Sequence, residues 1–117
     1  MSAFGDYLRQ RREHRLGEDP KFSVRKLAAA VGIEPSYLSK IERGEQPPPS
    51  AETISALAKE LGEDSDMLLA LGGKVSEDLL KIIRKRPQLF AQLIRELKDL
   101  PDHAVLRLVR EVRDGNW

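Results

Sequence analysis

Residues 22–44 constrain the fold more than any other part of the chain, and they read FSVRKLAAAVGIEPSYLSKIERG. After Ser23, a residue type that favours helix N-caps, apolar residues follow at helical spacing. Gly32 interrupts that spacing. Pro35 is favoured in the first turn of a new helix because its missing N–H has no partner there, and Gly44 suits the left-handed conformation that ends many helices. The pattern predicts two short helices joined by a turn of about four residues.

Two helices joined in this way form a helix-turn-helix, and in DNA-binding proteins the second helix of this motif enters the major groove. Small Ala28 and Ala29 allow the two helices to cross closely, and Gly32 permits the bend. The bend would present the second helix, about residues 35–43, as a ridge. The motif therefore predicts a surface that binds double-stranded DNA.

The same segment resembles the motif of the XRE-type, lambda-repressor-like transcriptional regulators of bacteria and phages. Eight positions fall in the register of that family: Leu27, Ala28, Gly32, Leu38, Ser39, Ile41, Glu42 and Gly44. The resemblance covers about residues 1–72 and includes a YLSKIERGE-PPPS signature followed by a short helical tail. It implies a DNA-binding transcriptional regulator. We expect this regulator to be sequence-specific and homodimeric, and a repressor rather than an activator, because no separate activation or sensor domain is evident.

The composition fits one all-α domain with an appendage. The 117 residues are 40% apolar and 33% charged but only 5% aromatic, and alternating β-branched runs are scarce. Without cysteine the chain has no disulfides, which is compatible with a reducing cytoplasm. No apolar run approaches the ~20 residues that cross a bilayer, and the N-terminus lacks a signal-peptide core. We therefore expect a cytoplasmic protein without membrane contact. The resemblance implies a bacterial or phage origin and association with the nucleoid when the protein is bound to DNA.

Charge supports this function only weakly. The net charge is +1. Residues 1–45 carry nine Lys/Arg and seven Asp/Glu, residues 46–73 carry one and five, and residues 74–117 carry ten and seven. An acidic middle thus separates two mildly basic ends, a distribution that many solvated surfaces share.

Helical periodicity divides the chain into two parts. Residues 1–73 are predicted to form five short helices, and the resemblance implies that they make up a DNA-binding domain of the lambda-repressor-like type. Its first helix is expected over about residues 3–14 and its fourth over 51–61, with a loop over 16–21 and a short fifth helix beginning at Asp64 or Ser65. The expected core consists of Leu8, Leu27, Leu38, Ile41, Ile54, Leu57 and Leu68.

Residues 74–117 are predicted to form a C-terminal extension of three amphipathic helices. Ser76 is a candidate cap for the first, while Pro87 and Pro101 are expected to open the second and the third. Three short helices offer one another little apolar surface, so we expect the extension to dimerise. Two alternatives stay open: the extension folds back on the first domain, or it binds another protein, as in an antitoxin that also autoregulates through DNA.

The resemblance also implies which residues contact DNA. The base-facing candidates are Pro35, Ser36 and Lys40, since Lys40 has the reach and charge for guanine O6/N7 and Pro35 can contact only a thymine methyl. Tyr37 and Ser39 would lie near the backbone or a base edge, and Arg43 near a phosphate. Ser23 and Arg25 begin the first helix of the motif, where N–H groups and charge favour phosphate. A regulator-like scaffold that has lost DNA binding is a third alternative.

An internal pair is expected as well. In the family, the acid near the end of the second motif helix pairs with an arginine of the first helix of the domain, which here indicates Arg12 and Glu42. Two positions depart from the family pattern: Val24 stands where Gln is usual, and Glu34 stands where Ser or Thr is usual. Glu34 is expected to favour the helix N-terminus through the macrodipole, or to accept from cytosine N4.

Nothing in the sequence indicates an enzyme. His14 and His103 are isolated, with no cysteine or paired carboxylate at metal-ligand spacing. The glycines form no phosphate-binding loop. We expect no catalytic residues, no cofactor and no metal.

Overall fold

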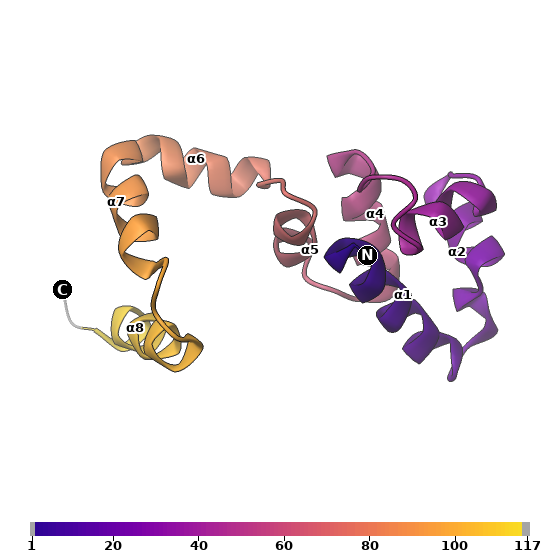
Figure 1. Ribbon diagram of the computed structural model, residues 1–117, viewed down its shortest axis with the longest axis horizontal. Helices are drawn as coiled ribbons and strands as arrows, with labels where there is room; N and C mark the ends of the chain where they lie inside the picture. Colours follow the sequence, from indigo (N-terminus) through magenta and orange to yellow (C-terminus); the bar gives the residue numbers. More distant parts are fainter. Residues whose placement is uncertain (1, 116–117) are drawn as a thin grey trace. The chain divides into compact units, whose positions relative to one another are not determined.

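The protein is all-α, as predicted. The structure, a computed structural model, describes residues 2–115, within which eight α-helices and one 3-10 turn occur and no strand (Figure 1). The chain divides into two compact units, the first ending at Leu79 and the second beginning at Leu80. The elements are α1 (Ala3–Leu16), η1 (Pro20–Phe22), α2 (Val24–Val31), α3 (Pro35–Glu42), α4 (Ala51–Leu61), α5 (Ser65–Leu71), α6 (Glu77–Lys85), α7 (Pro87–Leu97) and α8 (Asp102–Asp114).

Capping residues set most helix boundaries of the first unit. The Oγ atoms of Ser2, Ser23 and Ser50 accept the N–H groups that open α1, α2 and α4 at 3.1, 3.2 and 3.3 Å. Gly32 ends α2 and Gly62 ends α4, with φ of 77° and 69°. Only glycine adopts such angles without strain, so these two residues define the sharp turns after their helices.

Two predicted helix ends, those of the first helix and of the second motif helix, are wrong by one or two residues. The first helix continues past His14 to Leu16, and the loop after it contains the turn η1, which Asp19 opens by accepting the N–H of Lys21 at 3.0 Å. Phe22 of η1 is buried, which ties this connection to the core. The α3 helix ends at Glu42, and α8 begins at Asp102 with Pro101 as its N-cap.

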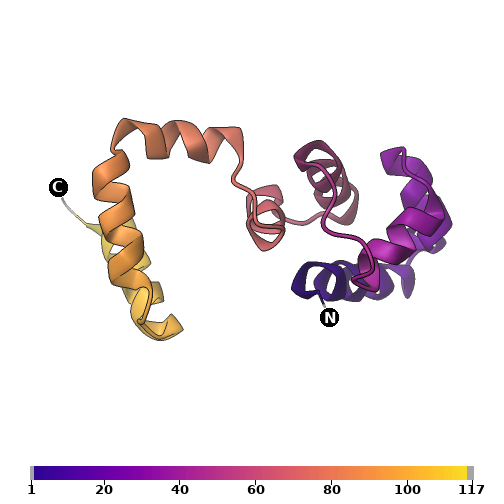
Figure 2. The same cartoon turned by 45° about the horizontal axis from the view of Figure 1, so that its top comes forward.

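The core of the first unit contains every predicted member. Leu8, Leu27, Leu38, Ile41, Ile54, Leu57 and Leu68 are all buried, joined by Phe4, Phe22, Ala28, Ala58, Leu61 and Leu69. Helix α1 contacts α3, α4 and α5, while α2 contacts α3 and α4 (Figures 1 and 2). Burial of so many aliphatic side chains gives α3 a fixed support on its inner side.

Helix α1 approaches the end of α3 so closely that only glycine fits. A Cβ atom on Gly5 would lie 2.8 Å from the carbonyl oxygen of Glu42 and nearer still to that of Ile41. These are backbone atoms and cannot rotate away. The missing side chain of Gly5 therefore sets the distance between α1 and α3.

The second unit has a different character. Within α6, α7 and α8 no residue is buried, although each helix carries regularly spaced aliphatic residues. The backbones of these three helices approach one another less closely than those of neighbouring helices in the first unit. Among the described residues, no helix has the length and apolar character needed to span a membrane.

Candidate nucleic-acid interface

Helix α3 has one face in the core and one face in solvent. Leu38, Ile41 and Glu42 are buried. Ser36, Lys40 and Arg43 are exposed. Because residues three and four positions apart lie on one side of a helix, these three side chains form a continuous outer row. The ridge expected from the sequence is therefore open to solvent on its polar side.

A buried ion pair holds α3 against α1. The Arg12 Nε donates to Glu42 Oε2 at 2.6 Å and Nη2 donates to Oε1 at 2.9 Å, a bidentate arrangement. The two side chains are only 7% and 4% exposed. A third donor, Nη1, reaches the carbonyl oxygen of Phe22 at 3.2 Å. This is the pair that the resemblance implies, and it links three elements at the base of the ridge.

Two of the residues predicted to contact phosphate, Ser23 and Arg25, lie at the N-terminus of α2. Ser23 Oγ accepts the N–H of Lys26, so its acceptor role is used in capping while its O–H can still donate to a phosphate oxygen. Arg25 is exposed beside it. Val24, at the position usually held by Gln, packs against the core instead.

Three other predicted contact residues are partly buried. Pro35 is the first residue of α3, Tyr37 packs against the core, and Ser39 lies between the exposed and buried faces. Glu34 is exposed at the N-cap of α3 and its side chain makes no capping hydrogen bond. Of the predicted residues, Ser36, Lys40, Arg43 and Arg25 are thus the most accessible to a duplex.

The comparison with known families agrees with this geometry. A family model described as a helix-turn-helix domain matches residues 3–71, which include α1 to α5. The chain belongs to this helix-turn-helix domain family. The match is consistent with the resemblance to XRE-type regulators and indicates a DNA-binding regulator. No curated protein and no solved structure shows significant similarity to the chain.

The helix-turn-helix domain also contains a hollow lined by arginines, which was not predicted from the sequence. Its volume is about 190 Å³, and it is lined by Arg9, Arg12, Glu13, Val24, Ser39, Glu42 and Arg43. Arg9, which was not among the predicted residues, brings a second exposed guanidinium to the side of α3 that carries Arg43. The signal was available, since Arg9 precedes Arg12 by one helical turn.

Both exposed arginines of the hollow are paired with acids in the free domain. Arg9 Nε lies 2.8 Å from Glu13 Oε1, and this hydrogen bond holds the pKa of Glu13 below its usual value. Arg43 pairs with Glu45. Exposed pairs of this kind are weak, so a phosphate group can replace either carboxylate.

Replacing Arg9 by glutamine is expected to weaken binding to every duplex by a similar factor. A phosphate contact positions the protein without reading sequence, so affinity should fall while the preferred site stays the same. The slope of log K against log salt should become shallower by no more than about 0.9. Fluorescence anisotropy with a labelled duplex at several salt concentrations measures both effects.

The matched control is Lys59→Gln, which removes one exposed positive charge from the last turn of α4. If Lys59→Gln weakens binding as much as Arg9→Gln, the effect comes from net charge, and Arg9 has no specific place at the DNA.

Proposed function

We propose that the protein is a sequence-specific transcriptional repressor that binds double-stranded DNA as a homodimer, with α3 in the major groove. The observation that carries the proposal is the outer row of Ser36, Lys40 and Arg43, exposed on a helix whose inner side is fixed by the Arg12–Glu42 pair. A rigid helix with exposed polar side chains suits base reading, because its contacts need no reordering on binding.

Each residue then has a chemical role. Lys40 donates to guanine O6 or N7, Ser36 donates to or accepts from a base edge, and Pro35 contacts a thymine methyl. Tyr37 and Ser39 approach the sugar-phosphate backbone near the same bases. The phosphates are contacted by Arg43 at one side of α3, and by Ser23 and Arg25 at the start of α2, where N–H groups point outward.

In this proposed function the protein acts in the cytoplasm by binding DNA and catalyses no reaction. Among the described residues, no group of three or more His, Asp or Glu side chains is placed to hold a metal ion. Repression follows from occupancy of a site that polymerase needs, and this requires no chemistry beyond recognition. The DNA-binding surface and the C-terminal helices are sufficient for such a role.

The alternative function is that of an antitoxin-like protein whose C-terminal helices bind and silence a second protein, with DNA binding used for autoregulation. The exposed aliphatic side chains of α6 to α8 favour some partner. Purification from the native host separates the two functions, because a stoichiometric foreign protein on these helices supports the antitoxin and its absence supports the repressor.

The experiment that tests the proposal is selection of binding sites from random duplexes at a stated salt concentration. We expect a palindrome whose half-sites lie about 34 Å apart, or one helical turn. Lys40→Ala should lower affinity for the selected site by about 1–3 kcal/mol, or roughly 5- to 150-fold, and relax selection at one base pair of each half-site.

Lys59→Ala, which removes the same side chain from an exposed position on α4, should leave the preference unchanged. Binding of the unaltered protein to all duplexes with equal affinity would contradict sequence-specific recognition.

A further inference from the structure

The second unit exposes more large aliphatic side chains than the larger first unit. Within the described part of the chain, nine of the fourteen exposed large apolar residues lie beyond residue 79. These are Ile82, Leu89, Leu93, Ile94, Leu100, Leu106, Leu108, Val109 and Val112. A soluble monomer rarely leaves so much contiguous apolar surface in water. The second unit therefore has the surface of a protein interface.

Part of this surface forms a groove between α7 and α8. The groove has a volume of about 530 Å³, and apart from Arg113 its lining is aliphatic, namely Leu93, Leu97, Val105, Leu108, Val109 and Val112. Leu93 also lines a second hollow of about 170 Å³, whose other lining residues are Ile82, Leu89, Phe90 and one cation, Arg86. The apolar surface is thus continuous from α6 to α8, and it is long enough to contact another helix along several turns.

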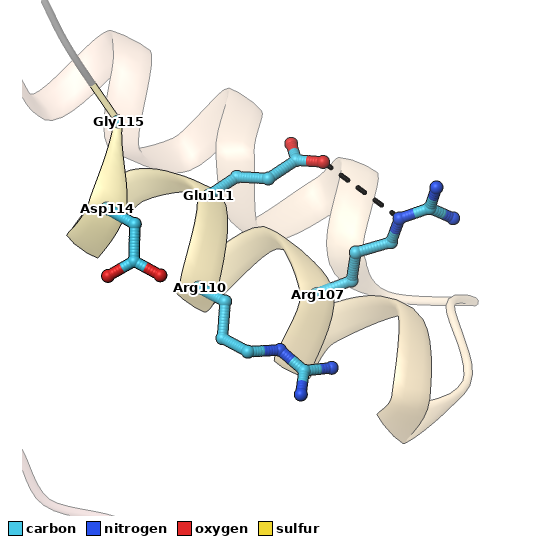
Figure 3. Close-up of a pocket in the computed structure, with 5 residues that line it drawn as sticks. All are labelled: Arg107, Arg110, Glu111, Asp114 and Gly115. Atoms are coloured by element: carbon cyan, nitrogen blue, oxygen red, sulfur yellow. Dashed lines mark ion pairs between the residues drawn. The ribbon is translucent and has the colours of Figure 1, made fainter.

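The polar side of α8 faces away from this groove. Figure 3 shows Arg107, Arg110, Glu111 and Asp114 projecting from one side of the helix, with Arg107 Nε 3.9 Å from Glu111 Oε1. The charged residues and the groove residues of α8 each recur at a spacing of three and four, but the two sets are shifted by one or two positions along the sequence. They therefore lie on different sides of the helix. Helix α8 therefore separates an apolar face from a charged face.

The charges of α7 and α8 favour a second copy of this chain over a strongly charged partner. Helix α7 carries one arginine and one glutamate, and α8 carries three arginines and three acidic residues. Because neither helix has a net formal charge, two copies can approach without like-charge repulsion. The mixed signs also allow the charged rim of one copy to meet opposite charges on the other. An acidic or basic partner would find no complementary field here.

We propose that the α7–α8 groove is the dimer interface, occupied by the α7–α8 face of a second copy across a two-fold axis. A two-fold interface uses the same patch on both subunits, so the groove of each copy is filled by aliphatic side chains of the other. Apart from Leu106, which does not line the groove, the large apolar side chains that the second unit exposes are each about half exposed, and together these eight offer an area of the order of the ~800 Å² per partner found in stable complexes. The inference rests on the homodimeric repressor proposed above and names the surface that pairs it.

Sedimentation equilibrium of the full chain is the first test. The unaltered protein should be a dimer in the micromolar range. Leu108→Asp places a carboxylate in the groove and should raise the dimer dissociation constant by about tenfold or more. Leu106→Asp makes the same change on the same helix outside the groove lining and should change it by less than about threefold. A monomeric unaltered protein, or equal effects of the two variants, would overturn the inference.

A second test does not depend on a destabilising substitution. Because the chain has no cysteine, single cysteines at Leu93 or Leu108 react only between copies. A short bis-maleimide should link either variant into covalent dimers in dilute solution, whereas Arg110→Cys on the charged face should stay monomeric. Linking through Arg110→Cys alone would place the interface elsewhere and overturn the inference.

The outcome is separable from that of the proposed function, because neither test contains DNA. A dimer paired through the groove that selects no DNA sequence would refute sequence-specific recognition and leave the interface standing. Conversely, if the protein selects a palindrome and its Leu108→Asp variant still dimerises normally, sequence-specific recognition stands and the groove is refuted as the interface.

Discussion

Replacing Arg12 by alanine is expected to destabilise the helix-turn-helix domain by about 3–5 kcal/mol. The substitution leaves the Glu42 carboxylate, only 4% exposed, without its bidentate partner. A buried charge without a partner is strongly unfavourable, and the carbonyl oxygen of Phe22 loses a donor at the same time. The free energy of unfolding, obtained from urea titration of the full chain by circular dichroism, measures the effect.

The chain offers a matched control for this prediction. Arg9→Ala also removes an arginine of α1 from an arginine–glutamate pair, but both partners are more than half exposed. Its effect on stability should be no more than about 0.5 kcal/mol. Similar values for the two variants would contradict the assigned role of the buried pair.

A double substitution separates stability from orientation. Arg12→Met combined with Glu42→Met removes both charges and should recover most of the lost free energy, because the desolvation of an unpaired charge disappears. We expect the affinity of this double variant for DNA to be lower than that of the unaltered protein, since the bidentate contact that fixes the direction of α3 is missing. Full DNA affinity in the double variant would indicate that core packing alone orients α3.

Gly5→Ala is expected to destabilise the domain by about 1–3 kcal/mol and to weaken DNA binding. The added methyl group would lie 2.8 Å from the carbonyl oxygen of Glu42, and this backbone atom can move only if α1 and α3 separate. Such a separation also stretches the Arg12–Glu42 pair. Thermal unfolding and anisotropy measured on the same preparation report both consequences.

Gly17→Ala is the control. Gly17 lies at the other end of α1 with a φ of −59°, which any residue adopts, and an added Cβ would be no closer than 3.4 Å to a neighbouring atom. Its stability should be unchanged or raised by up to about 1 kcal/mol, because alanine restricts the unfolded chain. A loss in Gly17→Ala as large as that in Gly5→Ala would show that any glycine replacement in α1 is harmful, whatever the contact.

The fold was predictable where local chemistry determines it. Capping serines, helix-opening prolines and the left-handed glycines at Gly32 and Gly62 act within four residues, so their effect is visible in the sequence. The role of Gly5 was not visible, because a glycine inside a helix has no periodic signature and its neighbour is 37 residues away. The turn η1 was missed because burial of Phe22 depends on how η1 packs against α1 and α2, which local sequence does not specify.

The proposed DNA-binding surface was predictable to the same extent, namely where helical spacing determines it. The positions of Ser36, Lys40 and Arg43 follow from helical spacing once α3 is recognised, and all three are exposed. The partial burial of Tyr37 and Ser39 depends on how α3 lies against the rest of the domain, which spacing alone does not specify. Helical spacing places Arg9 one turn before Arg12, but its position in the same hollow as Arg43 depends on the packing of three different helices.

The acidic neighbours of Arg9 and Arg43 bear on how the protein would search a genome. Glu13 and Glu45 act as built-in counterions, so a passing duplex must displace a carboxylate before it gains either arginine. If the proposed contacts are made, affinity for random sequence is thereby reduced, while the contacts of Lys40 and Ser36 with base edges are not weakened by a competing carboxylate. A molecule of this kind would spend less time on the wrong DNA, and its residence on the right site would depend mainly on the bases themselves.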